Sequence, residues 1–365
     1  MFEAPTEWIS PESFPDLKDH KYIAIDLETR DPDLKSRGSG SIIGNGEIVG
    51  ISVAVEGWSG YYSFGHAEGN FFDKEVVMRW IKEVCALPNV KLFHNAMYDV
   101  CWLRAYGVKI NGHIVDTMVM ASLIDENRFH YSLNSLSIDY LGQVKDETAL
   151  RAAAERAGVD AKAEMWKLPA MYVGLYAEKD AELTLSLFKK LSVEIKKQDL
   201  TKVFDLETQL FPCLIDMKFK GVRVDVQKAH TIKQKLAAQE ESLLLEVKKE
   251  TGIEPQIWAA RSIAKVFDKL GLNYVRTAKT QAPSFTKNFL QEHKNPIVNK
   301  IAKAREINKA HTTFIDTIIK YEHRGRIHAD INPIRGDSGG TVTGRFSYSN
   351  PNLQQIPARN KQIGP

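Results

Sequence analysis

The 365-residue sequence contains little cysteine, and its three cysteines, Cys85, Cys101 and Cys213, are far apart with no Cys-x-x-Cys pair. A disulfide framework or a zinc site requires more cysteine or histidine at close spacing, so we expect neither. We expect all three cysteines to be core residues in a reducing compartment. The sequence also lacks an apolar run of the roughly 18 residues that a membrane helix requires, and its first residues have no basic start or apolar segment. We therefore expect a globular, cytoplasmic protein without a membrane partner.

The net charge of +3 is small, but its distribution along the chain is uneven. Residues 1–200 carry 22 Lys and Arg against 30 Asp and Glu, a net charge of −8, whereas residues 201–365 carry 27 against 16, a net charge of +11. An acidic, metal-using half joined to a basic, phosphate-binding half would have this distribution. Lysines on solvated surface helices would produce it as well, so charge alone leaves both interpretations open.

The N-terminal half shows strand and helix periodicities in alternation, which predicts an α/β fold with a mixed sheet flanked by helices. The chain is long enough for two compact domains, or two and part of a third. Strands are expected at 21–29, 47–55, 60–65 and 91–94, and helices at 73–87, 95–107 and 173–197.

Beyond residue 200 the pattern changes to long amphipathic helices, in which leucines and charges repeat at helical spacing. Shorter helical patterns and a third long one follow, up to about residue 321. The segment from Arg324 onward is rich in Gly, Asn, Ser and Pro, which predicts strands and ordered loops. The C-terminal half is therefore expected to be mainly helical, with a short irregular end.

Two carboxylates, Asp26 and Glu28, lie two positions apart in the otherwise apolar stretch AIDLETR, residues 24–30. Residues i and i+2 of a strand share one face, about 7 Å apart along the chain, so both point away from the core that Ile25 and Leu27 fill. Neighbouring anions repel unless a cation lies between them, and a divalent metal would relieve the repulsion. A single pair of this kind is more often an exposed strand face.

Two further segments each place polar residues four positions apart in a predicted helix: Asn95 with Asp99, and Tyr176 with Asp180. Each pair is expected to share one helical face. Alone, either aspartate would be a surface or capping carboxylate, and Tyr176 a half-buried core residue. Four carboxylates from three segments of one α/β domain are much harder to explain by chance, so together they indicate a metal site.

The segments AIDLET, FHNAMYD and YAEKDAELT resemble the three motifs of the DEDD proofreading exonucleases, in the version that has a tyrosine in the third motif. The resemblance implies an RNase H-like fold and two Mg²⁺ or Mn²⁺ ions, since hard oxygen ligands suit hard cations. It also implies that Asp26 bridges the two ions and that Asp99 supports the second, partly through water. Glu28 and Asp180 would complete the first metal site.

The same resemblance implies that Tyr176, together with Glu28, orients the water that attacks the phosphodiester, and that Asn95 lies against the DNA. A phenol with a pKa of about 10 is a poor base at neutral pH, so loss of the proton from that water is better ascribed to a metal ion. The implied reaction is two-metal hydrolysis of a phosphodiester bond at a 3′ DNA end.

The sequence TVTGRFSYSNPNLQQIPARN, residues 341–360, closely resembles the signature of family A DNA polymerases at the junction of thumb and palm. The resemblance covers residues 20–365. It implies that Arg345 reaches the minor groove near the primer terminus and that Asn350, Asn352 and Gln354 line the primer–template path. The expected domains are an exonuclease at 1–200, a helical thumb region at 201–328 and the beginning of a palm at 329–365.

The sequence departs from this family in two ways. We expect no 5′ nuclease domain, as in phage polymerases, because nothing precedes the exonuclease pattern. The chain also stops at Pro365, before the palm and fingers motifs whose carboxylates hold the polymerase metals. We therefore expect no DNA synthesis by this chain alone, and we expect a separate chain that supplies palm and fingers.

Two other functions remain open from the sequence. The chain could be a non-catalytic DNA-binding or assembly subunit of a split polymerase, although all four carboxylates and Tyr176 are present. It could also be an RNA-trimming DEDD exonuclease, in which case the resemblance around residues 341–360 would be incidental. Release of label from single-stranded DNA and from RNA distinguishes the three.

Overall fold

The structure is a computed structural model that describes residues 6–336 and 339–357. It contains two compact units: Met1–Gly221 with His328–Asn352, and Val222–Ile327 with Leu353–Pro365. The first unit thus includes residues 201–221 and 328–352. The functional domain bounds expected from the sequence, at residues 200 and 328, stay a prediction. None of the helices among the described residues is both long and apolar enough to cross a membrane.

The first unit is built around a mixed five-stranded sheet with the strand order β3-β2-β1-β4-β5. β1, β2 and β3 pair with one another in antiparallel order, whereas β4 and β5 extend the sheet from the other side of β1 as parallel neighbours. The mixed sheet expected from the sequence is confirmed. Its strands are β1 (Tyr22–Arg30), β2 (Glu47–Val55), β3 (Trp58–Ser63), β4 (Val90–Phe93) and β5 (Ile114–Asp116).

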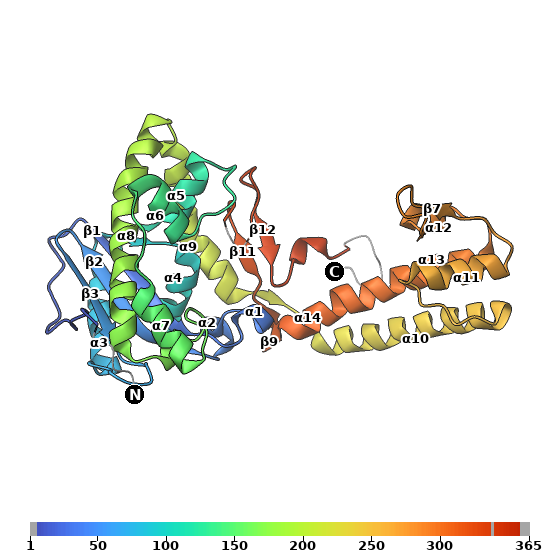
Figure 1. Ribbon diagram of the computed structural model, residues 1–365, viewed down its shortest axis with the longest axis horizontal. Coiled ribbons are helices and arrows are strands. Elements are labelled where there is room, and N and C mark those ends of the chain that lie inside the picture. The colour runs from blue at the N-terminus through green and yellow to red at the C-terminus, as the bar shows by residue number, and fades with distance from the viewer. Residues whose placement is uncertain (1–5, 337–338, 358–365) are drawn as a thin grey trace. The chain divides into compact units, whose positions relative to one another are not determined.

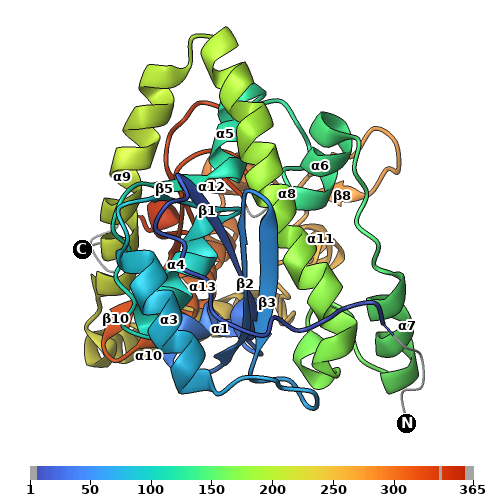
Figure 2. The same ribbon diagram turned by 90° about the vertical axis from the view of Figure 1, so that its left-hand side faces the viewer.

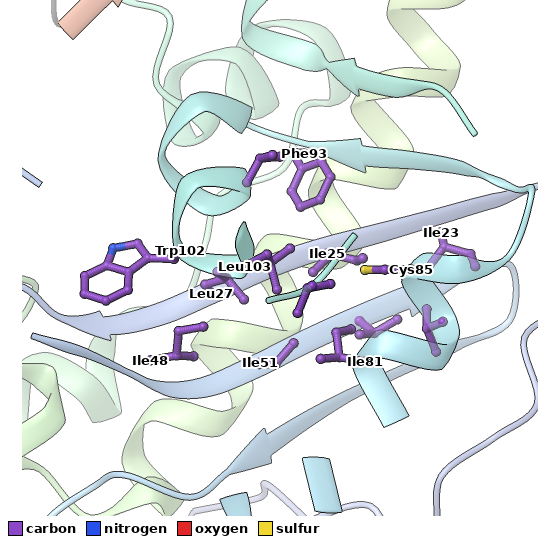
Figure 3. Packing of buried hydrophobic residues seen from close by; sticks show 14 of the residues in the cluster. Ile23, Ile25, Leu27, Ile48, Ile51, Ile81, Cys85, Phe93, Trp102 and Leu103 are labelled. Carbon is purple, nitrogen blue, oxygen red and sulfur yellow. The ribbon is translucent and has the colours of Figure 1, made fainter. Parts of the chain in front are cut away.

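One face of the sheet packs against α3 (Lys74–Ala86) and α4 (Ala96–Ala105). Ile23, Ile25 and Leu27 of β1 point to this side and lie in a buried apolar cluster (Figure 3). Because side chains alternate along a strand, the residues between them point to the opposite face. The apolar half of the alternating pattern therefore fixes the direction of Asp26 and Glu28.

The opposite face is covered by the long helix α8 (Ala170–Lys197), which lies on the other side of the strands from α3 (Figure 2). Ala24 of β1 and Ala181 and Leu183 of α8 share a second buried cluster. The helix expected at 173–197 is confirmed, and it begins three residues earlier. Further helices of this unit are α5 (Thr117–Ile124), α6 (Leu133–Leu141) and α7 (Thr148–Ala157).

The remaining elements of the first unit include two short helices that the sequence analysis did not predict. These are α1 (Leu34–Arg37) and α2 (Gly40–Ile43), which lie between β1 and β2. The others are a 3₁₀ turn (Met165–Lys167), α9 (Thr201–Lys220) and the paired strands β11 (Asp330–Asn332) and β12 (Ser347–Ser349).

A buried ion pair connects α9 to the later segment of the first unit. Lys218 of α9 is buried, and its Nζ lies 2.7 Å from Asp330 Oδ1 of β11. Nearby, His328 Nδ1 lies 2.8 Å from the carbonyl oxygen of Lys218. Residues 218 and 328–330 are therefore close in space although more than a hundred positions separate them in the sequence.

The second unit is mainly helical, as the sequence predicts. Its two longest helices, α10 (Val226–Thr251) and α13 (Pro296–Lys309), lie side by side (Figure 1). Its other helical elements are α11 (Ala260–Lys269), α12 (Lys287–Gln291), a π-helical turn (Ala310–Ile315), α14 (Asp316–Tyr321) and a 3₁₀ turn (Leu353–Gln355). Short strands complete it: β6 (Val222–Arg223), β7 (Val275–Arg276), β8 (Pro283–Ser284), β9 (Glu322–His323) and β10 (Arg326–Ile327).

The expectation that every cysteine is a core residue is wrong for one of the three. Cys85 and Cys101 are buried beside the sheet, but Cys213 is exposed. Cys213 lies on α9, whose buried side chains are Phe211, Leu214, Ile215 and Lys218. A helix with only one buried stripe leaves the positions between these residues in solvent.

Candidate active site

The first pair of carboxylates lies on β1, on the face of the sheet that α8 covers. Asp26 is opposite Ser52 and Glu28 is opposite Gly50 in the antiparallel ladder with β2. The register shifts between Glu28 and Thr29, which is a β-bulge directly after the second carboxylate. Bulges bend a strand and redirect side chains, and they are frequent next to active sites.

Helix α8 brings a third carboxylate to this pair. One oxygen from each of Asp26, Glu28 and Asp180 lies within 4.8 Å of the others, in a group that is half-buried at Asp26 and buried at the other two. Burial and the neighbouring negative charge of Asp180 raise the pKa of Asp26 to about 8. Burial also raises the pKa values of Glu28 and Asp180. The site therefore strongly favours a proton or a cation among its oxygens.

These residues fit divalent metal ions. The donors are carboxylate oxygens, which are the ligands that Mg²⁺ and Mn²⁺ prefer. They converge from a strand and a helix that are both held in the core, so the group does not depend on a loop. Burial first, and then the neighbouring negative charges, raise the pKa values of Asp26 and Glu28, and a dication would offset both effects.

The fourth predicted carboxylate, Asp99, lies close to this group but outside it. It is in the first turn of α4 and is only 4% exposed. Burial, followed by the charges of Asp26 and Asp116, raises its pKa well above the usual value, and a hydrogen bond with the Leu27 backbone opposes that rise. Asp99 is thus joined to β1 and is electrostatically coupled to Asp26.

The expectation that Asn95 and Asp99 share one helical face is wrong. Asn95 precedes α4 as its N-cap residue and has a left-handed backbone with φ of 64°. Its backbone N–H donates to Asp116 Oδ1 at 3.0 Å, and the N–H of Ala96 donates to Asp116 Oδ2 at 2.8 Å. Apolar periodicity in a sequence does not locate the first residue of a helix. Asparagine tolerates the left-handed backbone conformation better than most residues do.

Asp116 is a positioning residue that the sequence analysis missed. Besides its two bonds to the start of α4, its carboxylate accepts from the Met118 N–H at 2.8 Å and so caps α5 as well. Burial raises its pKa to about 6, and these backbone bonds oppose the rise. By fixing the start of α4, Asp116 sets where Asp99 lies.

Tyr176 is one helical turn before Asp180 on α8 and is half-buried. Burial raises the pKa of the Asp180 carboxyl, whereas Lys145 and, to a smaller extent, the Tyr176 hydroxyl lower it. Burial and the charges of Asp180 and Glu28 raise the pKa of the phenol far above its usual value. Tyr176 therefore keeps its proton and acts as a hydrogen-bond donor, not as a base.

Lys145 is a further residue of the site that the sequence analysis missed. It belongs to the segment between α6 and α7, and its Nζ forms an ion pair with Asp180 Oδ1. The same Nζ lies 4.6 Å from the centre of the Tyr176 ring, and the side chain is 6% exposed. Nothing in the polar stretch around it distinguishes this lysine from the others in the sequence.

Tyr61 and His66 form a polar wall beside the carboxylates. Tyr61 of β3 is fully buried, and its hydroxyl lies 2.5 Å from His66 Nε2. The ring crosses over Gly50, where an added Cβ would be 2.0 Å from the Tyr61 hydroxyl. Since Gly50 is the ladder partner of Glu28, the absent side chain at position 50 makes room for Tyr61 next to that carboxylate.

The residues expected to contact DNA in the polymerase-like segment are exposed: Arg345, Asn350, Asn352 and Gln354. Asn350 Nδ2 donates to Asp330 Oδ2 at 3.0 Å, which joins this segment to β11. The first three belong to the first unit and Gln354 to the second. Their contacts with DNA stay predictions.

The raised pKa of Asp26 predicts how the stability of the metal-free chain depends on pH. Its pKa is about 8 in the folded state against a usual value of 3.8, so the folded state binds the extra proton between these values. The stabilisation is present below about pH 4 and is lost as pH rises through 8. In chelator, the melting temperature of the wild type should fall more steeply from pH 5 to pH 9 than that of Asp26→Asn.

The matched control for this measurement is Asp205→Asn, which changes an exposed aspartate on α9. It should melt with the pH dependence of the wild type. Equal slopes for Asp26→Asn and the wild type would contradict the raised pKa of Asp26. Differential scanning fluorimetry over the pH series is sufficient.

Comparison with known proteins agrees with this geometry. A family model described as 3′-5′ exonuclease matches residues 7–196, and one described as DNA polymerase family A matches residues 226–364. A "DNA-directed DNA polymerase" of Pseudomonas phage M6 is 32% identical over 98% of this chain and 56% of its own length. A "DNA polymerase DpoZ" of Salmonella phage PMBT28 is 30% identical over 96% of this chain and 57% of its own length.

A bacterial relative and a solved structure extend the comparison. The "DNA polymerase I" of Synechocystis sp. is 28% identical over 86% of this chain and 32% of its own length. The structure of the POL domain of Pol1 from M. smegmatis, in complex with DNA primer-template and dNTP, has a TM-score of 0.69 at 18% identity. That match covers 94% of this chain and 54% of the solved one. The chain thus spans little more than half the length of the phage relatives.

Proposed function

Because this chain belongs to the 3′-5′ exonuclease family over its N-terminal half and to DNA polymerase family A over its C-terminal part, we propose that it removes nucleotides from 3′ ends of DNA as a proofreading exonuclease. The observation that carries the proposal is the group of three carboxylates from β1 and α8, whose oxygens lie within 4.8 Å of one another. Two-metal hydrolysis of a phosphodiester uses cations at such a group, because negative charge develops on both the attacking and the leaving oxygen.

Asp26, Glu28 and Asp180 would hold the metal ions, and Asp99 would support the second site from α4. Bound Mg²⁺ or Mn²⁺ would activate the attacking water and stabilise the leaving 3′ oxygen. A carboxyl binds a cation only when it is deprotonated. Because the pKa values of Asp26 and Glu28 are raised, metal binding would be coupled to proton release.

Tyr176 and Glu28 would orient the attacking water. The phenol donates a hydrogen bond, because its raised pKa keeps it protonated, and the carboxylate of Glu28 accepts one. The Tyr176 hydroxyl interacts with the Asp180 carboxylate, which would help to place the phenol. This is positioning, which contributes to rate by fixing the direction of attack.

The C-terminal part would hold the DNA that carries the 3′ end. Residues 201–365 have a net charge of +11, which favours contact with phosphates. Asn95 and the exposed residues Arg345, Asn350, Asn352 and Gln354 would contact the DNA. A mismatched end frays at lower cost than a paired end, so single-stranded ends would reach the carboxylates more often.

The test is release of a 3′ label from single-stranded DNA by the full 365-residue chain in Mg²⁺. We expect mononucleotide products with the wild type, none with Asp26→Ala/Glu28→Ala, and wild-type release with Glu83→Ala, an exposed charge control on α3. Label that stays on the DNA with a folded wild type would instead indicate a non-catalytic DNA-binding or assembly subunit. Faster release from RNA than from DNA would favour RNA trimming.

We also propose how this chain takes part in DNA synthesis, which partner chain it uses and where in the cell it acts. The phage relatives are longer than this chain. We propose that palm and fingers regions act together with it in DNA synthesis, and that a separate polypeptide can supply them. Addition of a palm-bearing polypeptide to the chain, a primer–template and dNTPs tests this by primer extension. The phage relatives also support a place of action in the cytoplasm of a host cell.

A further inference from the structure

Lys145 brings a positive charge into the group of carboxylates. Its ammonium pairs with Asp180 Oδ1, and its charge lowers the pKa values of both Asp26 and Glu28. It also lies over the Tyr176 ring, a contact that further stabilises an ammonium. Lys145 is thus a neighbour of every residue that we assign to the first metal site.

The segment that carries Lys145 is held mainly at its two ends. Gly142 closes α6 in a left-handed conformation, and Glu147 pairs with Arg151 of α7 and with Lys162. Between them, residues 143, 144 and 146 are exposed, and Val144 is 71% exposed. Few buried contacts therefore oppose a movement of Lys145 out of the group.

The ammonium and a divalent cation require the same carboxylate. Asp180 forms an ion pair with Lys145 through its Oδ1. Asp180 is also one of the three residues whose carboxylate oxygens lie close together. Lys145 supplies one positive charge to three carboxylates, whereas a single dication would supply two. Both cations at once would place like charges a few ångströms apart in a buried site, which is unfavourable.

We propose that Lys145 is an exchangeable counter-cation, which holds the carboxylates together before metal binds and leaves Asp180 when a divalent ion takes its place. The inference rests on the proposed metal site. It assigns Lys145 a positioning role: the lysine competes with metal, and the segment Gly142–Glu147 moves as the two exchange. Metal affinity in this chain is therefore set partly by a lysine and not by the carboxylates alone.

The test is the affinity of the full chain for Mn²⁺, measured without DNA by the electron paramagnetic resonance signal of free Mn²⁺. Lys145→Met keeps the apolar stem and removes the charge, so it should bind Mn²⁺ about tenfold more tightly than the wild type, as expected for loss of one competing charge pair. The matched control is Lys179→Met, which removes the same charge next to Asp180 from a side chain that pairs with Glu182. Its affinity should stay close to that of the wild type.

A second measurement uses the wild type alone and so does not depend on the folding of a variant. Acetylation of lysines, read by peptide mass spectrometry, should be slow at Lys145 in chelator and several-fold faster in saturating Mn²⁺. Lys189, which is exposed on α8, should react equally in both conditions. The counter-cation role predicts that only Lys145 changes.

The outcomes separate this inference from the proposed function. Equal Mn²⁺ affinity of Lys145→Met and Lys179→Met, or a Lys145 that stays protected in saturating Mn²⁺, would overturn the counter-cation role and leave the metal site standing. Failure of all forms of the chain to bind Mn²⁺ would overturn both. Tighter binding in Lys145→Met together with metal-dependent acetylation of Lys145 would establish the exchange.

Discussion

Replacement of Asp180 by asparagine is expected to lower the release of 3′ nucleotides by about 10³-fold, since loss of a metal ligand removes several kcal/mol of transition-state stabilisation. The amide has nearly the shape of the carboxylate but no charge, so it cannot neutralise a cation or pair with Lys145. It also weakens the acceptor for the Tyr176 hydroxyl. Single-turnover release of a 3′-labelled nucleotide in Mg²⁺ measures the effect.

Two further variants give this result its meaning. Glu182→Gln removes a half-exposed carboxylate two residues further along α8 and should leave release near the wild-type rate. Asp99→Asn should lower release less than Asp180→Asn does, because Asp99 lies outside the group of three converging oxygens. An Asp180→Asn chain that is folded and keeps more than a tenth of wild-type activity would contradict the assignment.

Replacement of Gly174 by alanine is expected to destabilise the first unit by about 2–3 kcal/mol, the usual cost of overpacking a buried site. An added Cβ at this position of α8 would lie 2.1 Å from Trp8 Cδ2, within the body of the indole ring. Trp8 is 7% exposed, and its Nε1 donates to Glu178 Oε1 at 2.9 Å, so the ring cannot move without losing these contacts. Urea denaturation followed by circular dichroism measures the change.

The sign of this effect is informative. Without the clash, alanine in place of glycine inside a helix would stabilise the protein by about 0.5–1 kcal/mol. In a Trp8→Ala background, Gly174→Ala should therefore cost nothing or become stabilising, which a double-mutant cycle detects. An equal cost of Gly174→Ala in both backgrounds would show that the contact with Trp8 is not responsible.

The sheet and the pair on β1 could be predicted from the sequence because their signal is local. The sequence alternates apolar and acidic residues from Ile25 to Glu28, which predicts that Asp26 and Glu28 share one face of the strand. Burial of Ile25 and Leu27 in the apolar cluster confirms that the acidic residues point to the opposite face. The helical spacing of apolar residues along the segment of α8 likewise predicts that Tyr176 and Asp180 share one side of a helix. What alternation does not contain is the distance between β1 and α8, which tertiary packing decides.

Other residues of the site gave no local signal. Lys145 lies in a polar segment without regular structure, and only the folded chain turns its side chain toward Asp180. Asp116 resembles an ordinary N-cap until its second oxygen is seen to hold Ala96. Apolar periodicity runs through Asn95 and predicts it inside a helix, whereas α4 begins one residue later, at Ala96, and the Asn95 N–H donates to Asp116 instead.

The ion pair between Lys218 and Asp330 has a consequence for the order of the two units along the chain. The chain leaves the first unit after Gly221 and re-enters it at His328, and these two points are adjacent because His328 contacts Lys218 itself. Residues Val222–Ile327 therefore leave and re-enter the first unit at neighbouring points, and β6 and β10 at their two ends pair with each other. Neighbouring ends allow a long excursion of the chain without separating the segments of the first unit that it connects.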